Sequence, residues 1–333
     1  MRWILMGAST IAAEHMIGAI RSQPGASVHR ILSSSPGRAA EFAATHGIPH
    51  HGSDLAAALA DPEAGAVYIS TTNEQHRAQA LAAIAAGKHV LCEKPLAMTA
   101  GEAAEMVLAA RARGVTFATN HHLRCAGSHR AIRALIAGGR IGKVLSLRIF
   151  HAVQLPAHLQ GWRINDAAAG GGVIADITVH NADTARFLLQ DEPVSVVAKM
   201  TASGLGEGVE DSAMSIWTMS SGAMVFSHES FTHPFAGSGL ELHGTAGSVF
   251  ARGVMSQSPL GEIELVTAAG REAIPFTRDD LYATGLAAFL AATRGEGAPA
   301  ASGEDGVRSL SIALAVRKAA RSGTCCPVTF PEL

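Results

Sequence analysis

The sequence of 333 residues is poor in charged residues, aromatic residues and cysteines. Charged residues make up 16% of the chain and the net charge is -2, so composition gives no electrostatic reason to expect a nucleic acid or an anionic membrane as partner. The four cysteines lack metal-type spacing, and the adjacent pair Cys325 and Cys326 is poorly suited to a structural disulfide. We therefore expect a reducing, cytoplasmic location.

Long apolar runs are also missing. No stretch reaches the roughly 20 consecutive apolar residues that a membrane-spanning helix needs. The first ten residues, MRWILMGAST, lack the extended apolar segment and small-residue cleavage site of a secretory signal. These absences predict a soluble protein whose partners are small molecules.

What the sequence does contain is typical of a packed globular protein. Hydrophobic residues make up 48% of the chain, and its length exceeds what one hydrophobic core usually supports, which predicts two domains. Short apolar runs alternate with helix-period segments up to residue 120, and this rhythm predicts a doubly wound parallel sheet. The predicted strands are 2–6, 27–32, 65–71, 88–92 and 115–120, and the predicted helices are 11–22, 36–47, 54–61, 74–87 and 100–114.

Helix boundary signals support this reading of residues 1–120. Gly47, Gly87 and Gly114 are placed as C-terminal stops, and Thr99 with Glu102 forms the pattern of a capping box.

From residue 121 the pattern changes to strand-like runs separated by glycine-rich turns, which predicts a second, α+β domain at 121–333 with a mostly antiparallel open sheet. The predicted fold class is thus α/β, with a Rossmann-like first domain at 1–120. The predicted strands of the second domain are 143–153, 194–202, 212–219, 222–229, 240–244, 248–251 and 262–267, and its predicted helices are 171–189, 281–295 and 303–323.

The loop GASTIA follows the first predicted strand, where a dinucleotide-binding fold has G-x-G-x-x-G/A. Gly7 and Ala12 fit that pattern, whereas Ser9 replaces the second glycine. A serine hydroxyl could donate to a phosphate oxygen, and the helix that follows presents N–H groups to an anion. An ordinary tight turn is the alternative interpretation.

The end of the second predicted strand indicates which dinucleotide binds. An NAD site places Asp or Glu about 20 residues after the glycines, and ILSSSPGR contains neither. Ser33 and Ser34 offer hydroxyl groups, and Arg38 can pair with a 2′-phosphate. The prediction is NADP(H) rather than NAD, against the alternative of a serine-rich loop with a solvated arginine.

Two further motifs suggest catalytic chemistry. CEKPLA places Lys94 after an apolar strand and before a proline, which disfavours helical backbone at Lys94. Asp176, His180 and Asp183 are spaced to share one face of a helix. A histidine with an unperturbed pKa of about 6.5 can exchange a proton near neutral pH. A metal site is the competing interpretation, but the motif is not H-E-x-x-H, and we predict no metal.

These motifs together resemble the glucose-fructose oxidoreductase / inositol dehydrogenase (Gfo/Idh/MocA) family. TTNEQH, CEKPLA and GGGVIADITVHNAD carry the resemblance, which covers nearly the whole chain. GASTIA, STTNE, AGKHVLCEKPLAMT, TNHHLR, HLQGWR and GEDGVRSL are similar to one NADPH-dependent subgroup of ketone reductases within it. The resemblance implies that Lys94 polarises a sugar carbonyl, that His180 is the general acid, and that Asp176 holds the His180 tautomer or binds a substrate hydroxyl.

The resemblance also implies a set of cofactor contacts. The residues that would contact NADPH are Ser9, Thr10, Ile11, Ala12, Ser33, Ser34, Arg38, Thr71, Thr72, Asn73, Glu74, Gln75, His76, Glu93, Lys94, Asn120, Trp162, Arg163 and Tyr282. Glu93 could instead orient Lys94 or be a surface acid, and Trp162 could serve packing alone. His121 and His122 could meet substrate or lie at the surface.

Three functions remain open at this point: reduction of a sugar ketone by NADPH, oxidation of a polyol or inositol by the same chemistry, and non-catalytic sensing of NADP. The sequence leaves the oligomeric state undecided, because the strands of the second domain alternate enough to permit a monomer.

Overall fold

The computed structural model describes residues 1–333, which form two compact units. The first contains residues 1–121, 282–307 and 331–333, and the second contains residues 122–281 and 308–330. The sequence predicts 121–333 as one domain, whereas in the structure this stretch supplies the second unit and also two segments of the first. Residues 282–307 belong to the first unit because helix α9 (Leu281–Thr293) packs there: the centre of the Phe289 ring lies 5.3 Å from that of Trp3.

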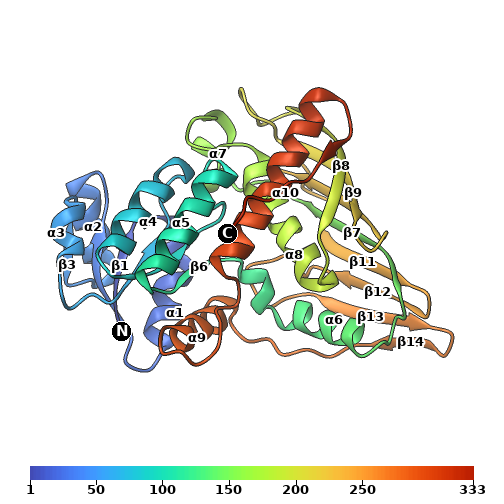
Figure 1. Ribbon diagram of the computed structural model, residues 1–333, viewed down its shortest axis with the longest axis horizontal. Helices are drawn as coiled ribbons and strands as arrows, with labels where there is room; N and C mark the ends of the chain where they lie inside the picture. The colour runs from blue at the N-terminus through green and yellow to red at the C-terminus, as the bar shows by residue number, and fades with distance from the viewer. The chain divides into compact units, whose positions relative to one another are not determined.

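The first unit is built on a six-stranded parallel sheet with the order β3-β2-β1-β4-β5-β6 (Figure 1). The order reverses between β1 and β4, so the loops after these strands lie at the switch point where open α/β sheets bind ligands. The predicted Rossmann-like sheet is confirmed. Its strands are β1 (Arg2–Met6), β2 (Ser27–Leu32), β3 (His50–Gly52), β4 (Ala66–Ile69), β5 (His89–Cys92) and β6 (Phe117–Thr119).

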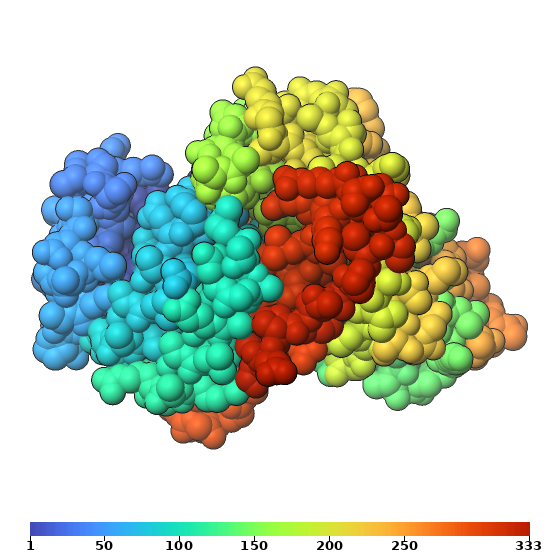
Figure 2. All heavy atoms as spheres, turned by 45° about the horizontal axis from the view of Figure 1, so that its top comes forward, coloured from blue at the N-terminus to red at the C-terminus, as the bar shows by residue number.

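Helices lie against this sheet (Figure 1), and in Figure 2 residues of the first unit form the blue to cyan part of the surface. The helix after β1 begins with a π-helical stretch rather than the regular α-helix that its periodicity predicts. The predicted capping box is present at Thr99 and Glu102, and Gly47 and Gly114 adopt left-handed C-cap conformations. The helical elements are η1 (Ala12–Met16), α1 (Ile17–Ser22), α2 (Pro36–His46), α3 (Leu55–Leu59), η2 (Asn73–Gln75), α4 (His76–Ala85), α5 (Ala100–Arg113) and α9.

The second unit is built on a nine-stranded sheet with the order β14-β13-β12-β11-β7-β10-β9-β8-β15. Its pairings are antiparallel except for β10 with β7, which confirms a mostly antiparallel sheet. The strands are β7 (Val144–Ala152), β8 (Pro193–Thr201), β9 (Ser212–Met219), β10 (Met224–Ser230), β11 (Ser238–Gly244), β12 (Gly247–Arg252), β13 (Glu262–Thr267), β14 (Gly270–Ala273) and β15 (Cys326–Pro327).

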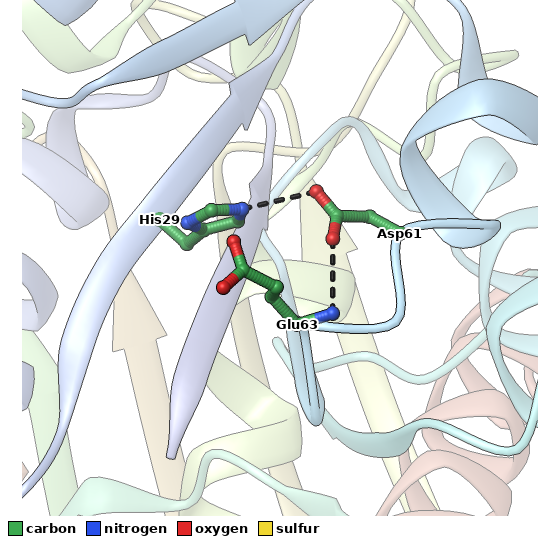
Figure 3. Close-up of side chains that lie close together, drawn as sticks. All are labelled: His29, Asp61 and Glu63. Carbon is green, nitrogen blue, oxygen red and sulfur yellow. Dashed lines mark hydrogen bonds and ion pairs between the residues drawn. The ribbon is translucent and has the colours of Figure 1, made fainter.

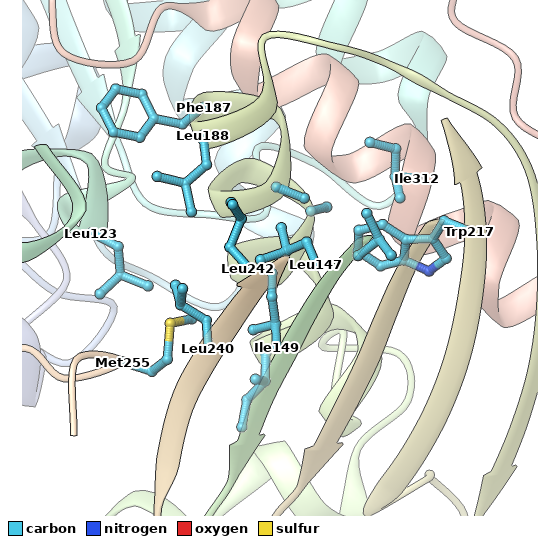
Figure 4. Packing of buried hydrophobic residues seen from close by; sticks show 14 of the residues in the cluster. Leu123, Leu147, Ile149, Phe187, Leu188, Trp217, Leu240, Leu242, Met255 and Ile312 are labelled. Atoms are coloured by element: carbon cyan, nitrogen blue, oxygen red, sulfur yellow. The ribbon is translucent and has the colours of Figure 1, made fainter. Parts of the chain in front are cut away.

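One face of this sheet is covered by helices and forms the core of the second unit. Figure 4 shows Leu188 of α8 and Ile312 of α10 near the inward side chains of the strands, among them Leu147 and Trp217. The helical elements are η3 (His122–Cys125), α6 (Gly127–Ala137), η4 (Ala157–Leu159), α7 (Trp162–Asn165), η5 (Ile174–Thr178), α8 (Val179–Leu189) and α10 (Gly303–Ser322), whose first turn belongs to the first unit.

Sequence patterning did not predict several short or atypical elements. Helix α6 was missed, as were the two- to four-residue strands β3, β14 and β15, which are too short to show a period. The opposite face of the nine-stranded sheet carries partly exposed apolar side chains such as Met214 and Ile216. None of the helices combines the length and the apolar character that a membrane crossing requires.

Candidate active site

The loop after β1 comes very close to the end of β4. Gly7 has φ +104°, and a Cβ atom there would lie 2.8 Å from the Ser70 carbonyl oxygen, so a side chain is excluded on both grounds. The Ser9 hydroxyl lies 2.7 Å from the Ser70 hydroxyl and accepts a 3.2 Å hydrogen bond from Ala12 N–H. Ser9 thus caps the helix that opens here, in addition to any contact with a phosphate. Ser9, Thr10 and Ile11 are partly exposed.

The loop after β2 is tied to the glycine loop through Arg38. Its guanidinium group donates a 2.7 Å hydrogen bond to the Ala8 carbonyl oxygen, although the two residues are 30 positions apart. Ser35 caps α2 by accepting from Arg38 N–H, while Ser34 is exposed and Ser33 is partly exposed. The structure therefore brings a cation and two hydroxyl groups to the rim of the glycine loop, which suits a phosphorylated ribose.

The loop after β4 contains residues 71–76, whose side chains mostly engage one another. Thr72 donates a 2.7 Å hydrogen bond to Glu74, and Gln75 donates to Thr72 at 3.1 Å. His76 is fully buried, with Nδ1 2.8 Å from the Pro95 carbonyl oxygen and Nε2 3.2 Å from that of Thr71. His76 therefore joins the loops after β4 and β5, a structural task beside the predicted cofactor contact.

Two buried side chains hold the carboxylate of Glu93, which directly follows β5. The hydroxyl of fully buried Tyr68 donates a 2.5 Å hydrogen bond to Glu93 Oε1, and Asn120 Nδ2 donates to the same oxygen at 2.6 Å. Burial raises the pKa of Glu93, and these two donors and the Lys94 charge oppose that rise. Glu93 is therefore a fixed neighbour of Lys94, not a solvated surface acid. Lys94 itself is partly exposed at the carboxyl end of β5.

Replacing Tyr68 with phenylalanine tests this support. The change removes the buried donor to Glu93, so we expect the free energy of unfolding to fall by about 1.5–3 kcal/mol, the usual range for a hydrogen bond to a charged group. The pKa of Glu93 should rise further, because one of the interactions that lowers it is lost. Denaturant unfolding and a carboxyl NMR titration measure the two effects. An unchanged Glu93 titration would contradict the interpretation.

The second unit places Asp176 in η5, a π-helical turn, and His180 at the start of α8. The helix that carries both residues is therefore irregular where the sequence predicts a regular α-helix. Asp176 Oδ2 lies 3.6 Å from Arg163 Nε, and the Arg163 guanidinium carbon lies 4.7 Å from the centre of the Trp162 ring. Trp162, Arg163 and Asp176 thus form one connected group.

His180 lies within a cluster of histidines. Its ring centre is 5.0 Å from that of His122, in an edge-to-face arrangement, and 6.4 Å from that of His151. His180 and His122 are buried, each with 7% of its surface exposed. The imidazoles of His122 from η3 and His151 from β7 therefore both lie near that of His180, although only His180 is predicted to be catalytic.

Asp183 does not face the same surroundings as Asp176. It accepts two hydrogen bonds from Arg124, of 2.8 Å from Nε and 2.7 Å from Nη2, and it is almost fully buried. A bidentate, buried pair of this kind fixes η3 against α8. Asp183 is therefore a structural partner of Arg124, and the arginine itself could not be identified from spacing.

Tyr282 and Asn120 are both buried in the first unit. The Tyr282 ring stacks on that of His15 with 4.5 Å between centres, next to the helix that follows the glycine loop. This packing accounts for the burial of Tyr282. Its predicted contact with NADPH remains a prediction.

One further cluster of titratable groups lies apart from these loops. Figure 3 shows His29 of β2 beside Asp61 and Glu63 of the loop that precedes β4, at the amino-terminal edge of the sheet. His29 Nε2 is 3.0 Å from Asp61 Oδ2, and this contact is the main reason that the pKa of Asp61 is lowered to about 2. Arg30 pairs with Asp61 and Arg2 with Glu63, so the cluster is typical of an ion-pair network.

Comparison with known proteins agrees with both halves of this description. Residues 1–121 match the model of an oxidoreductase family with an NAD-binding Rossmann fold, and residues 129–250 match the GFO/IDH/MocA C-terminal domain. The chain is 53% identical over 328 residues to 1,5-anhydro-D-fructose reductase of Ensifer adhaerens, which covers 98% of each chain. The chain belongs to the Gfo/Idh/MocA oxidoreductase family. The predicted family is confirmed, and the first unit is its nucleotide-binding Rossmann domain.

Solved structures share the fold across nearly the full chain. The aldose-aldose oxidoreductase from Caulobacter crescentus, complexed with glycerol, has a TM-score of 0.90 at 23% identity and covers 98% of this chain and 99% of its own. Levoglucosan dehydrogenase, in complex with NADH and levoglucosan, has a TM-score of 0.88 at 23% identity and covers 99% of both chains. At this identity the likeness establishes the fold alone.

Sequence reasoning missed the residues that form hydrogen bonds with Glu93, Asp183 and Thr178. Tyr68 lies inside an apolar strand and reads as a core residue, and Arg124 is one of several arginines without a distinctive spacing. Glu229 carried a usable signal, because it follows Val225 and Ser227 in the alternating, inward-facing row of β10. A carboxylate in an inward row is unusual enough to flag.

Proposed function

We propose that this chain is an NADPH-dependent reductase that converts 1,5-anhydro-D-fructose to 1,5-anhydro-D-mannitol by hydride transfer to the C2 ketone. The observation that carries the proposal is the 53% identity to 1,5-anhydro-D-fructose reductase over 98% of both chains. At 53% identity over nearly the full length, the two sequences align residue by residue through the motifs that determine substrate and cofactor, so the comparison does not depend on the fold alone. The glycine loop, the CEKPLA segment and the helix with His180 all fall inside the matched range.

The residues of the first unit fit a bound dinucleotide. The close approach at Gly7 leaves no room for a side chain, and Ser9 to Ala12 open a helix whose N–H groups suit a phosphate. The cofactor, when bound, supplies the hydride. Ser33, Ser34 and Arg38 would take the adenosine ribose and its 2′-phosphate, and residues 71–76 with Glu93 and Asn120 would line the remainder.

Three side chains would act on the substrate. Lys94 would donate a hydrogen bond to the ketone oxygen and stabilise the negative charge that develops there. His180 would give a proton to that oxygen as general acid. Asp176, paired with Arg163, would orient His180 or accept a hydrogen bond from a substrate hydroxyl. The presence of all three residues favours a catalyst over an NADP-binding sensor.

The test is a substrate panel with the purified chain. Loss of NADPH absorbance is followed with 1,5-anhydro-D-fructose, other ketoses, osones and inosones, and the product is identified by NMR. We expect anhydrofructose to give the highest kcat/KM and the product to be the mannitol epimer. Faster oxidation of an inositol than reduction of any ketose would replace this function with a polyol dehydrogenase. NADPH binding without turnover on any substrate would replace it with a sensor.

Replacing Arg38 with alanine tests the preference for NADPH. The charge-assisted contact to a 2′-phosphate should be lost, so KM for NADPH should rise about 10- to 100-fold while KM for NADH stays nearly constant. Arg21→Ala is a matched control, because Arg21 also donates to a backbone carbonyl of this unit, that of His46. An equal rise for both cofactors would mean that Arg38 acts only by holding Ala8 in the glycine loop.

A further inference from the structure

The helix that carries Asp176 and His180 is not regular, and something must hold it in that shape. Residues 174–178 form a π-helical turn, and α8 continues from Val179 as an α-helix. A π-turn is rare, because it is less favourable than the α-helix it interrupts, and such turns occur often at functional sites. The direction in which Asp176 and His180 point depends on this turn.

A fully buried carboxylate lies beneath the turn. Glu229 of β10 accepts hydrogen bonds from the hydroxyl of Thr178, from Ser227 Oγ at 2.8 Å and from Asn181 Nδ2 at 3.2 Å. Asn181 also donates to Ser227 at 3.0 Å, and all four residues are fully buried. Thr178 and Asn181 lie on either side of Val179 and His180 in the sequence. The network therefore binds the helix before and after His180.

Such a group is expensive in the core of a sheet. Burial raises the pKa of Glu229 to about 7, although three donors oppose the rise. An apolar side chain of similar volume would avoid the loss of hydration, and in other proteins such replacements are often neutral or stabilising. An apolar residue could not supply direction. The hydrogen bonds from Thr178 and Asn181 fix the rotation of the helix about its axis, and the one from Ser227 of the same strand holds the carboxylate.

We propose that Glu229 is a positioning residue that, through Thr178 and Asn181, sets the orientation of the turn bearing Asp176 and His180. The role assigned to His180 rests on the proposed function. The geometric part of the inference, that Glu229 determines the surroundings of the His180 ring, does not depend on the identity of the substrate.

Other titratable groups lie on the elements packed against β10. His151 of β7 is its partner in the strand register, and its ring centre lies 6.4 Å from that of His180. Asp211 immediately precedes β9, and the helix contributes Asp176, His180 and Asp183. Asp183 is already paired with Arg124, and Asp211 accepts from the N–H groups of a neighbouring loop. A titration experiment must therefore separate Glu229 from His151 and Asp176.

The experiment compares Glu229→Gln, Glu229→Leu and Thr178→Val in the full chain. Ser215→Ala is the matched control, because Ser215 is a buried hydroxyl of the adjacent strand β9 that accepts from Trp217 and not from the helix. We expect Glu229→Leu and Thr178→Val to lower kcat about tenfold or more, with the Kd of NADPH unchanged. Glu229→Gln keeps the side-chain shape and one acceptor oxygen but replaces the other oxygen with a donor NH2 group, so it should lower kcat less than Glu229→Leu does.

A second measurement is independent of turnover. The His180 ring signal is followed by NMR from pH 5 to 9 in the original chain and in Glu229→Gln, with His151→Gln as a background that removes the neighbouring imidazole. We expect a second inflection in the original chain that is absent after Glu229→Gln. If Glu229→Leu folds poorly, Thr178→Val and Glu229→Gln still decide the matter.

The outcomes are distinct. An unaltered kcat in Thr178→Val together with the same His180 titration in Glu229→Gln would overturn the inference. Absence of turnover in the original chain, with the expected change in the His180 signal, would support the positioning role while rejecting the proposed function.

Discussion

Replacing Lys94 with alanine is expected to lower kcat for ketone reduction about 100- to 1,000-fold while the Kd of NADPH changes little. As hydride reaches the ketone carbon, negative charge develops on its oxygen, and a fixed cation stabilises that charge more than it stabilises the ground state. Lys94 is suited to this role because its neighbour Glu93 is held by Tyr68 and Asn120, so the chain at the end of β5 has a defined position.

The measurement combines steady-state kinetics with fluorescence titration of NADPH. Lys88→Met is the control, because Lys88 precedes β5 and donates to the carbonyl oxygens of Asp61 and Ala64. That variant should lose stability but keep kcat within about threefold, since Lys88 lies at the opposite end of the strand from Lys94. A Lys94→Ala variant with an undiminished kcat would remove Lys94 from the mechanism.

Replacing His180 with alanine should lower kcat about 100-fold or more, the usual contribution of a positioned general acid. The sign of the pH dependence follows from the role. A general acid must be protonated to act, so kcat should fall as pH rises through the pKa of that acid. In His180→Ala this alkaline limb should disappear, because no proton donor remains at that position. The measurement is kcat against pH at saturating NADPH.

His129→Gln is the matched control for His180. His129 is a fully buried histidine of the same unit, and burial lowers its pKa to about 4, so its imidazole is neutral at the pH of the assay. A neutral imidazole is too weak an acid to act as the proton donor, so replacement of His129 should leave the alkaline limb in place. If His180→Ala retained the limb, another group would be the acid, and His122 and His151, the rings that adjoin it, would be the next to test.

Much of the fold could be predicted from periodicity. The parallel sheet and the capping box at Thr99 arise from local patterns: apolar runs of strand length, helix-period stripes, and residues whose side chains satisfy helix ends. Helix α6 was missed although residues 127–137 carry apolar side chains at helical spacing, with Ile132 and Leu135 buried. The π-turn of η5 was missed because a wide turn has no distinctive composition, and its shape depends on what packs below it.

The candidate site divides in the same way. Lys94, Asp176 and His180 stand in motifs whose residue types and spacing point to hydride-transfer chemistry. Tyr68, Arg124 and Glu229 form hydrogen bonds with Glu93, Asp183 and Thr178, from which they are separated by 25, 59 and 51 positions along the chain. Such pairings arise only when strands and helices distant in sequence are packed together.

By itself the sequence determined the fold class and the family, because short motifs and local periodicity encode them directly, and the same motifs predict Lys94, Asp176 and His180 as the residues that would carry the chemistry. Only the tertiary structure decided that Tyr68 of the sheet donates a hydrogen bond to Glu93 and that Arg38 reaches the glycine loop. It also decided that Asp183 pairs with Arg124, whereas Asp176 pairs with Arg163. The physical reason is that a side chain's partners are set by burial and by hydrogen bonds that must be satisfied in three dimensions, and neither is visible along a linear chain.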